Sequence, residues 1–418
     1  MGKVKNVPKL RFPEFEGEWS EKKLGEISIK INSGKTPLGG ESVYTKDGIL
    51  FIRSQNVTND QLSFENSTYI PEEINATMRN SIVKPHDILL NITGASLGRS
   101  CVVPDDFSIG NVNQHVCIIR INKTNEPYFI QPIFTSTKGQ NLFISLQTGS
   151  GREGLNFQSI RKIKLHFPSL PEQQKIASFL TSVDNKIQQL TRKKTLLEQY
   201  KKGVMQKIFS QEIRFKDDEG NEFPKWKEKS LGEVGNTYNG LVGKSKENFG
   251  IGKPYIQYKQ IFDNSIIDIS RFELVEVREN EKQNKVIFGD IFFTVSSETP
   301  DEIGMASVLL DKVEELYLNS FCFGFRPISL DFLNPYFAQF LFRNQIFRKE
   351  IIKLAQGSTR YNMSKVQLMK LKIDLPCFLE QQKIANFLTS IDKKIESVNT
   401  QLINTQAFKK GLLQQMFV

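Results

Sequence analysis

The sequence contains two near-copies of one segment, and a repeat of this kind constrains the architecture before any local propensity does. Residues 172–187 read EQQKIASFLTSVDNKI, and residues 380–395 read EQQKIANFLTSIDKKI. Thirteen of the 16 positions are identical, at a constant offset of 208 residues. Chance does not produce such agreement, so we expect a fold made of two related repeats.

The correspondence between the two halves of the chain extends beyond this segment, at an offset that drifts from 203 to 208 residues. Further pairs keep their order along the chain: Arg11 with Arg214, Trp19 with Trp226, Asp87 with Asp290, Arg120 with Arg326, and Lys201 with Lys409. A diverged globular half is thus followed by a near-identical segment, twice. We expect the segments that stayed alike to do the same job and the diverged halves to do different ones.

The near-identical segments have the apolar period of coiled-coil helices. In the first copy the apolar residues recur every seven positions, at Ile176, Val183, Leu190, Leu197 and Val204. The second copy repeats this at Ile384, Ile391, Val398 and Leu412, with Thr405 as the exception. Each helix of about 38 residues would be about 57 Å long. Because neither narrow seam is stable alone, the helices should cover each other, and a two-fold relation makes them antiparallel, with the globular halves at opposite ends.

Each globular half is predicted to be an α+β domain of about 150 residues. Short apolar runs such as residues 49–52 and 116–119 read as strands, and the segments 127–139 and 335–347 read as helices. Arg11 and Phe12 precede the first half as Arg214 and Phe215 precede the second. Since Arg214 directly follows the first helix, the N-terminal arm should pack near the end of the last one, close to Val418.

Composition places the chain among ordinary globular proteins without a disulfide framework or a metal site. The 418 residues are 39% hydrophobic and carry four cysteines and three histidines, with no C-x-x-C pair. No apolar run is long enough to cross a bilayer, so a cytoplasmic location is the default. The net charge of +10 is compatible with a polyanionic partner, although solubility alone explains it equally well.

Motifs of known catalytic chemistry are weak or missing. Residues 149–154 fit G-x-G-x-x-G, but no long helix follows, and the second copy at 357–361 lacks two of the glycines. Residues 334–337 (Asn-Pro-Tyr-Phe) are similar to the Asn-Pro-Pro-Tyr/Phe loop of adenine methyltransferases, but a helix N-terminal proline explains them better. Asp87 and Asp290 read as turn residues before strands. We find no P-loop and no activated nucleophile, and therefore predict a chain that is not an enzyme.

The duplicated EQQKIAxFLxSxDxKI segment, preceded by Gly-Ser, Arg and Pro behind each variable half, resembles the specificity subunit of type I restriction-modification systems. The resemblance covers essentially the whole chain. It implies two tandem α/β target recognition domains, related by a pseudo-two-fold axis and separated by a pair of long antiparallel coiled-coil helices. It places an N-terminal arm at 1–20, the recognition domains at 21–170 and 213–378, and the helices at 171–212 and 379–418.

The same resemblance implies the partners. Each recognition domain would read one half of a bipartite site in double-stranded DNA, while the helices dock two methyltransferase (modification) subunits. Restriction (nuclease) subunits would join this complex. S-adenosylmethionine, ATP and Mg are expected only in those partner subunits, with no cofactor and no membrane contact for this chain.

The candidate site residues are of two kinds. DNA readers need guanidinium, amide, amine and hydroxyl groups on loops, because these can pair with phosphates and base edges. The candidates for DNA binding are Lys35, Arg53, Gln55, Thr93, Arg99, Gln114 and Arg152 in the first half, and Lys244, Tyr258, Lys259, Ser296, Ser297 and Arg360 in the second. The candidates for binding partner subunits are Gln173, Ile176, Phe179, Leu180 and Val183, and Gln381, Ile384, Phe387, Leu388 and Ile391.

Two other functions stay open from the residues alone. The chain could be a coiled-coil scaffold that joins two protein-binding modules and never contacts DNA. It could also be an enzyme that modifies DNA itself, although no catalytic motif supports this.

Overall fold

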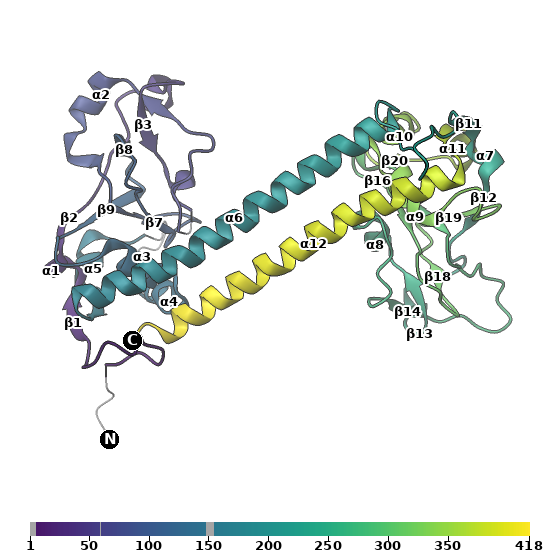
Figure 1. Ribbon diagram of the computed structural model, residues 1–418. Coiled ribbons are helices and arrows are strands. Elements are labelled where there is room, and N and C mark those ends of the chain that lie inside the picture. Colours follow the sequence, from purple (N-terminus) through teal and green to yellow (C-terminus); the bar gives the residue numbers. More distant parts are fainter. Residues whose placement is uncertain (1–5, 59, 148–153) are drawn as a thin grey trace. The chain divides into compact units, whose positions relative to one another are not determined.

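The computed structural model describes residues 6–58, 60–147 and 154–418, and this part of the chain divides into two compact units. Unit 1 comprises Met1–Arg192 together with Asn399–Val418, and unit 2 comprises Lys193–Val398. The two units share most of their succession of elements, although among the described residues α2 (Glu72–Thr77) and β5 (Ile82–Val83) occur only in unit 1, and β16 (Ser296–Ser297) and β20 (Tyr361–Asn362) only in unit 2 (Figure 1). The predicted α+β class, with two repeated domains and two long helices packed together, is confirmed.

The main sheet of each unit has four antiparallel strands in equivalent order. In unit 1 the order is β2 (Ser28–Ser33), β9 (Val116–Ile121), β6 (Ile88–Asn91) and β7 (Ser100–Val102). In unit 2 it is β12 (Gly235–Asn239), β19 (Cys322–Pro327), β15 (Ile291–Thr294) and β17 (Ala306–Val308). The strands β6 and β15 are buried along their whole length, because they are interior strands rich in Ile, Leu and Phe.

Each unit also has a second sheet and a short antiparallel pair. The second sheet of unit 1 is β4 (Tyr69–Ile70), β3 (Ile49–Ile52), β8 (Gly110–Val112) and β5 (Ile82–Val83). That of unit 2 is β14 (Glu273–Val275), β13 (Phe249–Ile256) and β18 (Tyr317–Leu318). The pairs are β1 (Ser20–Lys23) with β10 (Lys164–Phe167), and β11 (Lys227–Ser230) with β21 (Lys372–Leu375).

Of the five α-helices described in each globular part, four recur in matching positions, whereas α2 follows β4 and α8 (Tyr258–Asp263) directly follows β13, so these two do not correspond. They are α1 (Leu24–Ile27), α2 (Glu72–Thr77), α3 (Pro127–Thr135), α4 (Thr137–Leu146) and α5 (Phe157–Lys162) in unit 1, and α7 (Leu231–Val234), α8 (Tyr258–Asp263), α9 (Pro335–Leu341), α10 (Gln345–Ile352) and α11 (Lys365–Lys370) in unit 2.

The single helices predicted over 127–139 and 335–347 are wrong, because each segment is broken by a polar residue that starts a new helix. The Ser136 hydroxyl accepts a hydrogen bond from the Gly139 N–H, which caps the start of α4. The Asn344 side chain accepts from the Phe347 N–H and caps α10 in the same way.

The two long helices, α6 (Leu170–Phe209) and α12 (Phe378–Gln415), run through both units. In unit 1 the first part of α6 lies beside the last part of α12, and Asp184 pairs with Lys409 at 2.5 Å. In unit 2 the last part of α6 lies beside the first part of α12, and Lys201 pairs with Asp392 at 2.5 Å. The partner moves back along α12 as the residue moves forward along α6, so the helices are antiparallel (Figure 1).

In unit 1 the same ion pair also ties the helices to the globular part. The Lys409 ammonium contacts the carboxylate of Asp60, at 2.7 Å, as well as that of Asp184. Burial alone would lower the pKa of Lys409, but the two carboxylates together raise it above its ordinary value. Lys409 therefore stays charged although its side chain is only 8% exposed.

A buried glutamate at the start of each long helix binds the arm that precedes each globular part. The Glu172 carboxylate accepts hydrogen bonds from the Arg11 guanidinium, at 2.8 Å, and from the Trp19 indole. The Glu380 carboxylate accepts the equivalent bonds from Arg214 and Trp226. These are the repeated residues of the sequence, and this contact explains why they recur together.

Asp87 and Asp290 do more than shape turns. Asp87 is fully buried and binds the Arg120 guanidinium through both carboxylate oxygens, at 2.6 and 2.7 Å. Asp290 binds Arg326 in the same way, at 2.8 and 2.7 Å. Each aspartate also accepts a backbone N–H of the preceding turn, as the sequence indicated. In both units a buried aspartate thus forms a two-pronged ion pair that holds the central strand against its neighbour, with the arginine more exposed in unit 2 than in unit 1.

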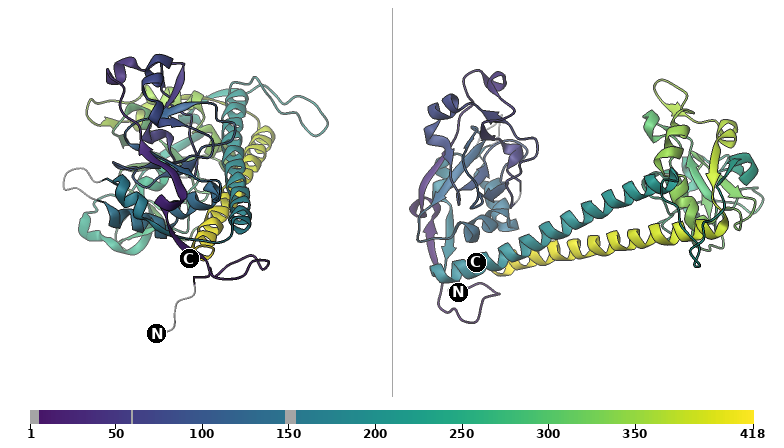
Figure 2. Two further views of the ribbon diagram at one scale, coloured as in Figure 1. Left: turned by 90° about the vertical axis from the view of Figure 1, so that its left-hand side faces the viewer. Right: turned by 45° about the horizontal axis from the view of Figure 1, so that its top comes forward.

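The N-terminal arm lies beside the end of α12 within unit 1, which confirms the expectation drawn from the repeat (Figure 2). The Leu10 N–H donates a hydrogen bond to the Gln415 carbonyl, and Phe417 packs against Phe129 with ring centroids 5.4 Å apart. Residues at the far end of the sequence therefore complete the core of the first globular part.

The Glu172 contact gives a stability prediction. Changing Glu172→Gln should lower the free energy of unfolding by about 3 kcal/mol, because the largely buried Arg11 guanidinium loses its counter-charge. Denaturant unfolding of the full chain measures this change. The matched control is Glu21→Gln, which breaks the exposed pair with Lys164 and should change the free energy of unfolding little, because solvent screens that pair. Equal losses for the two variants would contradict a structural role for Glu172.

Candidate nucleic-acid interface

Most of the predicted DNA-binding residues lie in loops and turns that surround the end of the central strand of each unit. In unit 1 this is the end of β6, and in unit 2 it is the end of β15. The loops belong to segments that are far apart in sequence, and side-chain hydrogen bonds connect several of them.

In unit 1 a chain of hydrogen bonds links three of these loops. The Thr36 hydroxyl contacts Gln114, the Gln114 amide contacts a ring nitrogen of His115, and the other ring nitrogen of His115 lies 2.6 Å from the Thr93 hydroxyl. Lys35 precedes Thr36 and is exposed. Lys35, Thr93 and Gln114 are therefore held in one region of the surface, and Lys35 and Gln114 face solvent.

Glycine makes this approach of the loops possible. A Cβ at Gly34 would lie 1.5 Å from the carbonyl oxygen of Val112, so no other residue fits without moving the backbone. Gly240 holds the equivalent place in unit 2, where a Cβ would lie 2.1 Å from the carbonyl of Asn319.

Arg53 and Gln55 lie in the turn that follows β3, and this turn is tied to the end of β6. The Asn91 amide donates to the Ser54 carbonyl at 2.8 Å. The Arg53 guanidinium lies over the Tyr44 ring at 5.8 Å, and its Nε is buried without a hydrogen-bond partner among the described residues. Gln55 is exposed and donates to the Asn66 carbonyl.

The two remaining candidates of unit 1 are Arg99 and Arg152. Arg99 is exposed and directly precedes β7. Arg152 lies outside the described residues.

In unit 2 four of the predicted residues line one cavity of about 220 Å³. They are Tyr258, Ser296, Ser297 and Arg360. The Tyr258 hydroxyl donates to the Ser296 carbonyl at 2.6 Å, and burial raises the pKa of Tyr258, which keeps the phenol neutral. Ser296 and Ser297 form the short strand β16 (Ser296–Ser297), which pairs with β20 (Tyr361–Asn362) and so brings the exposed Arg360 beside them.

The other two candidates of unit 2 lie apart from this cavity. Lys259 is exposed on α8. Lys244 forms an ion pair with Glu281, and its side chain is only 3% exposed. A phosphate could bind Lys244 only after that pair had broken.

The residues predicted to bind partner subunits are largely occupied within the chain. Eight of them are buried in the cores of their own units: Gln173, Ile176, Leu180, Val183, Gln381, Ile384, Leu388 and Ile391. The remaining two, Phe179 and Phe387, pack edge-to-face on Phe12 and Phe215. Any surface that these helices offer to another protein must therefore be formed by their exposed neighbours.

Gln173 and Gln381 show what the repeated segment does locally. The Gln173 side chain accepts from the Glu126 N–H and donates to the Pro168 carbonyl, both at 3.0 Å. The Gln381 side chain does the same with Asn334 and Pro376. Each glutamine fixes the start of a helix of the globular part, α3 or α9, against the long helix.

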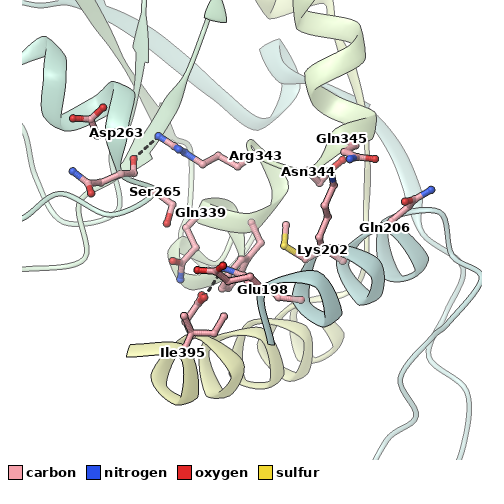
Figure 3. A pocket seen from close by; sticks show the side chains of 15 residues that line it. Glu198, Lys202, Gln206, Asp263, Ser265, Gln339, Arg343, Asn344, Gln345 and Ile395 are labelled. Carbon is pink, nitrogen blue, oxygen red and sulfur yellow. Dashed lines mark hydrogen bonds and ion pairs between the residues drawn. The ribbon is translucent and has the colours of Figure 1, made fainter. Parts of the chain in front are cut away.

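A second cavity of unit 2, of about 650 Å³, lies between α6, α12 and α9 (Figure 3). Three of its charged side chains, Lys201, Asp392 and Arg343, are engaged within the chain. The Arg343 guanidinium donates to the backbone carbonyls of Ala306, Ile261 and Phe262, and burial lowers the pKa of Arg343 to about 10. Such an arrangement stabilises the loop after α8 and gives no nucleophile with a partner base.

Two further findings concern other kinds of site. In residues 6–58, 60–147 and 154–418, no three His, Cys, Asp or Glu side chains lie close enough together to hold a metal ion. No helix in this part of the chain is long and apolar enough to cross a membrane.

Comparisons with known proteins identify the family. The family model described as "Type I restriction modification DNA specificity domain" matches residues 16–199 and again residues 224–405. The two matches together span most of the chain and coincide with its repeat. The chain belongs to the family of type I restriction-modification specificity subunits.

Curated relatives agree with this assignment. The specificity subunit of the type I restriction enzyme MjaVIII from Methanocaldococcus jannaschii is 25% identical over 432 residues, covering 98% of this chain and 93% of the relative. The specificity subunit of the enzyme EcoBI from Escherichia coli is 29% identical over 177 residues, covering 40% and 35%. A specificity subunit is the non-catalytic, DNA-recognising part of its restriction-modification system, and that is the function of this chain.

Solved structures show the same fold. The S subunit of a type I system from M. genitalium matches with a TM-score of 0.60 at 15% identity, covering 99% of each chain. A chain from a structure of type I complex assembly and conformational transition matches with a TM-score of 0.55 at 18% identity, covering 95% of this chain and 96% of that chain. The architecture of this specificity subunit is thus shared with proteins of low sequence identity.

Sequence reasoning missed several residues of the interface. Tyr44 and His115 support predicted residues, and Phe262, Glu298 and Glu302 line the cavity of unit 2. The acidic residues were not among the candidates, because the prediction of DNA readers rests only on guanidinium, amide, amine and hydroxyl groups on loops. The one available signal was position: Glu298 directly follows the predicted Ser296 and Ser297.

The Tyr258 contact can be tested by its effect on unit 2. Changing Tyr258→Phe should lower the free energy of unfolding by about 1 kcal/mol, because the Ser296 carbonyl loses its donor in a half-buried place. Tyr200→Phe is the control, since that hydroxyl belongs to an exposed side chain and should change the value by less than about 0.5 kcal/mol. Denaturant unfolding measures both, and a loss of the same size in the control would remove the assigned role.

Proposed function

We propose that each unit of this specificity subunit reads one half of a bipartite site in double-stranded DNA, and that the long helices bind two methyltransferase subunits. One observation carries the proposal. Corresponding residues make the same framework contacts in the two units, yet the loops at the ends of their central strands differ in chemistry.

The shared frame consists of the buried ion pairs and the caps described above. Glu172 and Glu380 bind the arms, and Asp87 and Asp290 bind the arginines of the neighbouring strand. A frame that is the same in both units presents both sets of loops in the same way. Different loops on one frame are what two readers of different sequences need.

The loops after the central strands differ most clearly. In unit 1 residues 93–99 read Thr-Gly-Ala-Ser-Leu-Gly-Arg, with one positive charge and no acid. In unit 2 residues 296–302 read Ser-Ser-Glu-Thr-Pro-Asp-Glu, with three acids and no base. Direct readout depends on matching donors and acceptors to base edges, so these loops would favour different bases.

The predicted division of the chain fits this proposal. Residues 21–170 and 213–378 would carry the two readers, and the helices predicted over 171–212 and 379–418 would keep them at a fixed separation. Half-sites read from one face of B-DNA lie one helical turn, about 34 to 36 Å, or a near multiple apart. The two half-sites would then be separated by base pairs that the protein does not read.

The partner surface on the helices is proposed from exposure. Tyr200 on α6, in unit 2, and Phe408 on α12, in unit 1, are each 54% exposed. They are 208 residues apart, so they hold the same place in the two repeats. Two equivalent exposed aromatic side chains suit two copies of one partner, because aromatic residues are common energetic centres of protein interfaces.

The partners would supply the chemistry. S-adenosylmethionine would bind to the methyltransferase subunits, while ATP and Mg would be used by the complex that includes restriction subunits. The residues of this chain would recognise the DNA and position the methyltransferase subunits on it. The two alternative functions differ from this proposal: a scaffold would not contact DNA, and a DNA-modifying enzyme would methylate DNA without partner subunits.

The decisive experiment exchanges one reader. Replacing residues 21–150 with the corresponding domain of another specificity subunit should change one half of the methylated sequence and leave the other half intact, as sequencing of methylated DNA would show. The unmodified complex is the control, and its retention on target DNA should fall steeply with salt. A change in both halves, salt-independent absence of DNA binding, or methylation by the chain alone would each contradict the proposal.

The helix surface has its own test. Tyr200→Ala or Phe408→Ala should each weaken binding of one methyltransferase subunit by about 2 kcal/mol, roughly 30-fold in Kd, and reduce the stoichiometry from two to one. Mass measurement of the purified complexes gives the stoichiometry. Ile144→Ala removes an exposed apolar side chain that belongs to α4 and not to the long helices, and it should leave both subunits bound.

A further inference from the structure

We propose that the cavity of unit 2 is a base-reading site that selects an exocyclic amino group in the major groove, with Glu298 and Glu302 as the hydrogen-bond acceptors. This inference rests on the proposed function, since it names what the unit 2 reader recognises. The amino groups that fit are N4 of cytosine and N6 of adenine.

The first support is the shape of the cavity. One wall is formed by the rings of Tyr258 and Phe262, which are nearly parallel, with centroids 6.1 Å apart and an interplanar angle of 18°. The Tyr258 hydroxyl is fixed on the Ser296 carbonyl, so the wall is held in place by β16. The cavity, of about 220 Å³, therefore exists before any ligand binds.

The second support is that the charges around the cavity have no partners. Among the described residues, no ion pair or side-chain hydrogen bond engages Glu298, Glu302 or Arg360. Other carboxylates of the same unit, such as Glu281 and Glu315, are paired with lysines. Carboxylates that stay unpaired at the rim of a cavity remain available to a donor from outside.

A hydroxyl group in the cavity is also open to a ligand, independently of the acids. Ser296 is only 6% exposed and lines the cavity, and its hydroxyl has no hydrogen-bond partner in the described part of the chain. The hydroxyl oxygen is not fully enclosed, so it can bind a polar group that enters the cavity from outside.

Electrostatics decides which group that is. A carboxylate near DNA is repelled by the phosphates, and a base edge that offers only acceptors, such as guanine N7 and O6, repels it as well. Only an amino group, on cytosine or adenine, offers it a donor. The two glutamates therefore increase the affinity for a base with an amino group and decrease it for the other bases. Such a combination of attraction and repulsion produces specificity.

Unit 1 provides the contrast within the same molecule. At the position that Glu298 occupies in unit 2, unit 1 has Ala95, and its loop ends in the exposed Arg99. Arginine favours the acceptors of guanine. Arg360 also lines the unit 2 cavity, so the acids are what separates the two readers: unit 2 offers acceptors for an amino group beside an arginine, whereas the unit 1 loop offers an arginine without acids.

The test uses the full chain in complex with its methyltransferase subunits and compares two double variants with the same charge change. One is Glu298→Gln with Glu302→Gln. The control is Glu279→Gln with Glu314→Gln, which alters two exposed glutamates of the same unit outside the cavity. Affinities for target DNA and for random-sequence DNA are measured across a salt series.

The expected results separate reading from charge. Both double variants should bind random DNA more tightly than the unmodified complex, because each loses two negative charges. The cavity variant alone should lose preference for target over random DNA, by roughly 5- to 150-fold, and sequencing of methylated DNA should show relaxed choice at one base pair of one half-site. If the cavity variant and the control variant showed the same changes in affinity for target DNA and for random DNA, the inference would be overturned.

Base analogues identify the amino group. At the relaxed position, purine in place of adenine, or 2-pyrimidinone in place of cytosine, removes only the exocyclic amino group. The unmodified complex should lose affinity on the analogue, and the cavity variant should lose no further affinity. If the cavity variant lost as much affinity on the analogue as the unmodified complex does, the inference would be overturned. If the unmodified complex had no preferred sequence, the proposed function itself would be overturned.

Discussion

A carboxylate buried at the start of each long helix holds the whole architecture together. Glu172 and Glu380 are 2% and 0% exposed, and each binds an arginine and a tryptophan from the arm ahead of its globular part. A buried carboxylate is tolerated only where charged and polar donors surround it, so the arm cannot leave without a large cost. The next residue of each copy, Gln173 or Gln381, binds the start of another helix. The repeated segment is therefore conserved between the two copies because it joins three elements of the fold in each unit.

The framework contacts and the loops proposed to read DNA are made by different residues. The proposed recognition can therefore change while the framework is kept. The buried pairs of the frame leave little freedom for substitution, whereas the loops at the end of β6 and β15 contribute little to the cores. Ser-Ser-Glu in one unit and Thr-Gly-Ala in the other occupy the same place without altering the sheet order. Under the proposed function, these loops are where specificity would change while the framework contacts stay the same.

The sequence predicted what repeats and missed what depends on contacts between distant residues. The period of seven and the duplicated segment were enough for the two long helices, because these signals are local and occur twice. The breaks at Ser136 and Asn344 were missed, since a single cap competes with otherwise continuous helical patterns. For the interface, residue type and loop position found Tyr258, Ser296, Ser297 and Arg360, which line one cavity. The pairing of Lys244 with Glu281 and the burial of Ile176 could not be foreseen, because each depends on packing between segments far apart in sequence.

The composition of unit 1 has a consequence for the order in which the molecule is completed. Unit 2 is one continuous stretch, Lys193–Val398, whereas unit 1 needs Asn399–Val418 as well. Leu412 and Met416 lie in its core, and Gln415 binds the backbone of Leu10. During synthesis the unit whose residues emerge first is therefore completed only after all residues of the other unit have been made. Until those final helical turns appear, the nascent first domain must wait with part of its core uncovered, and a terminal truncation would harm the opposite end of the polypeptide.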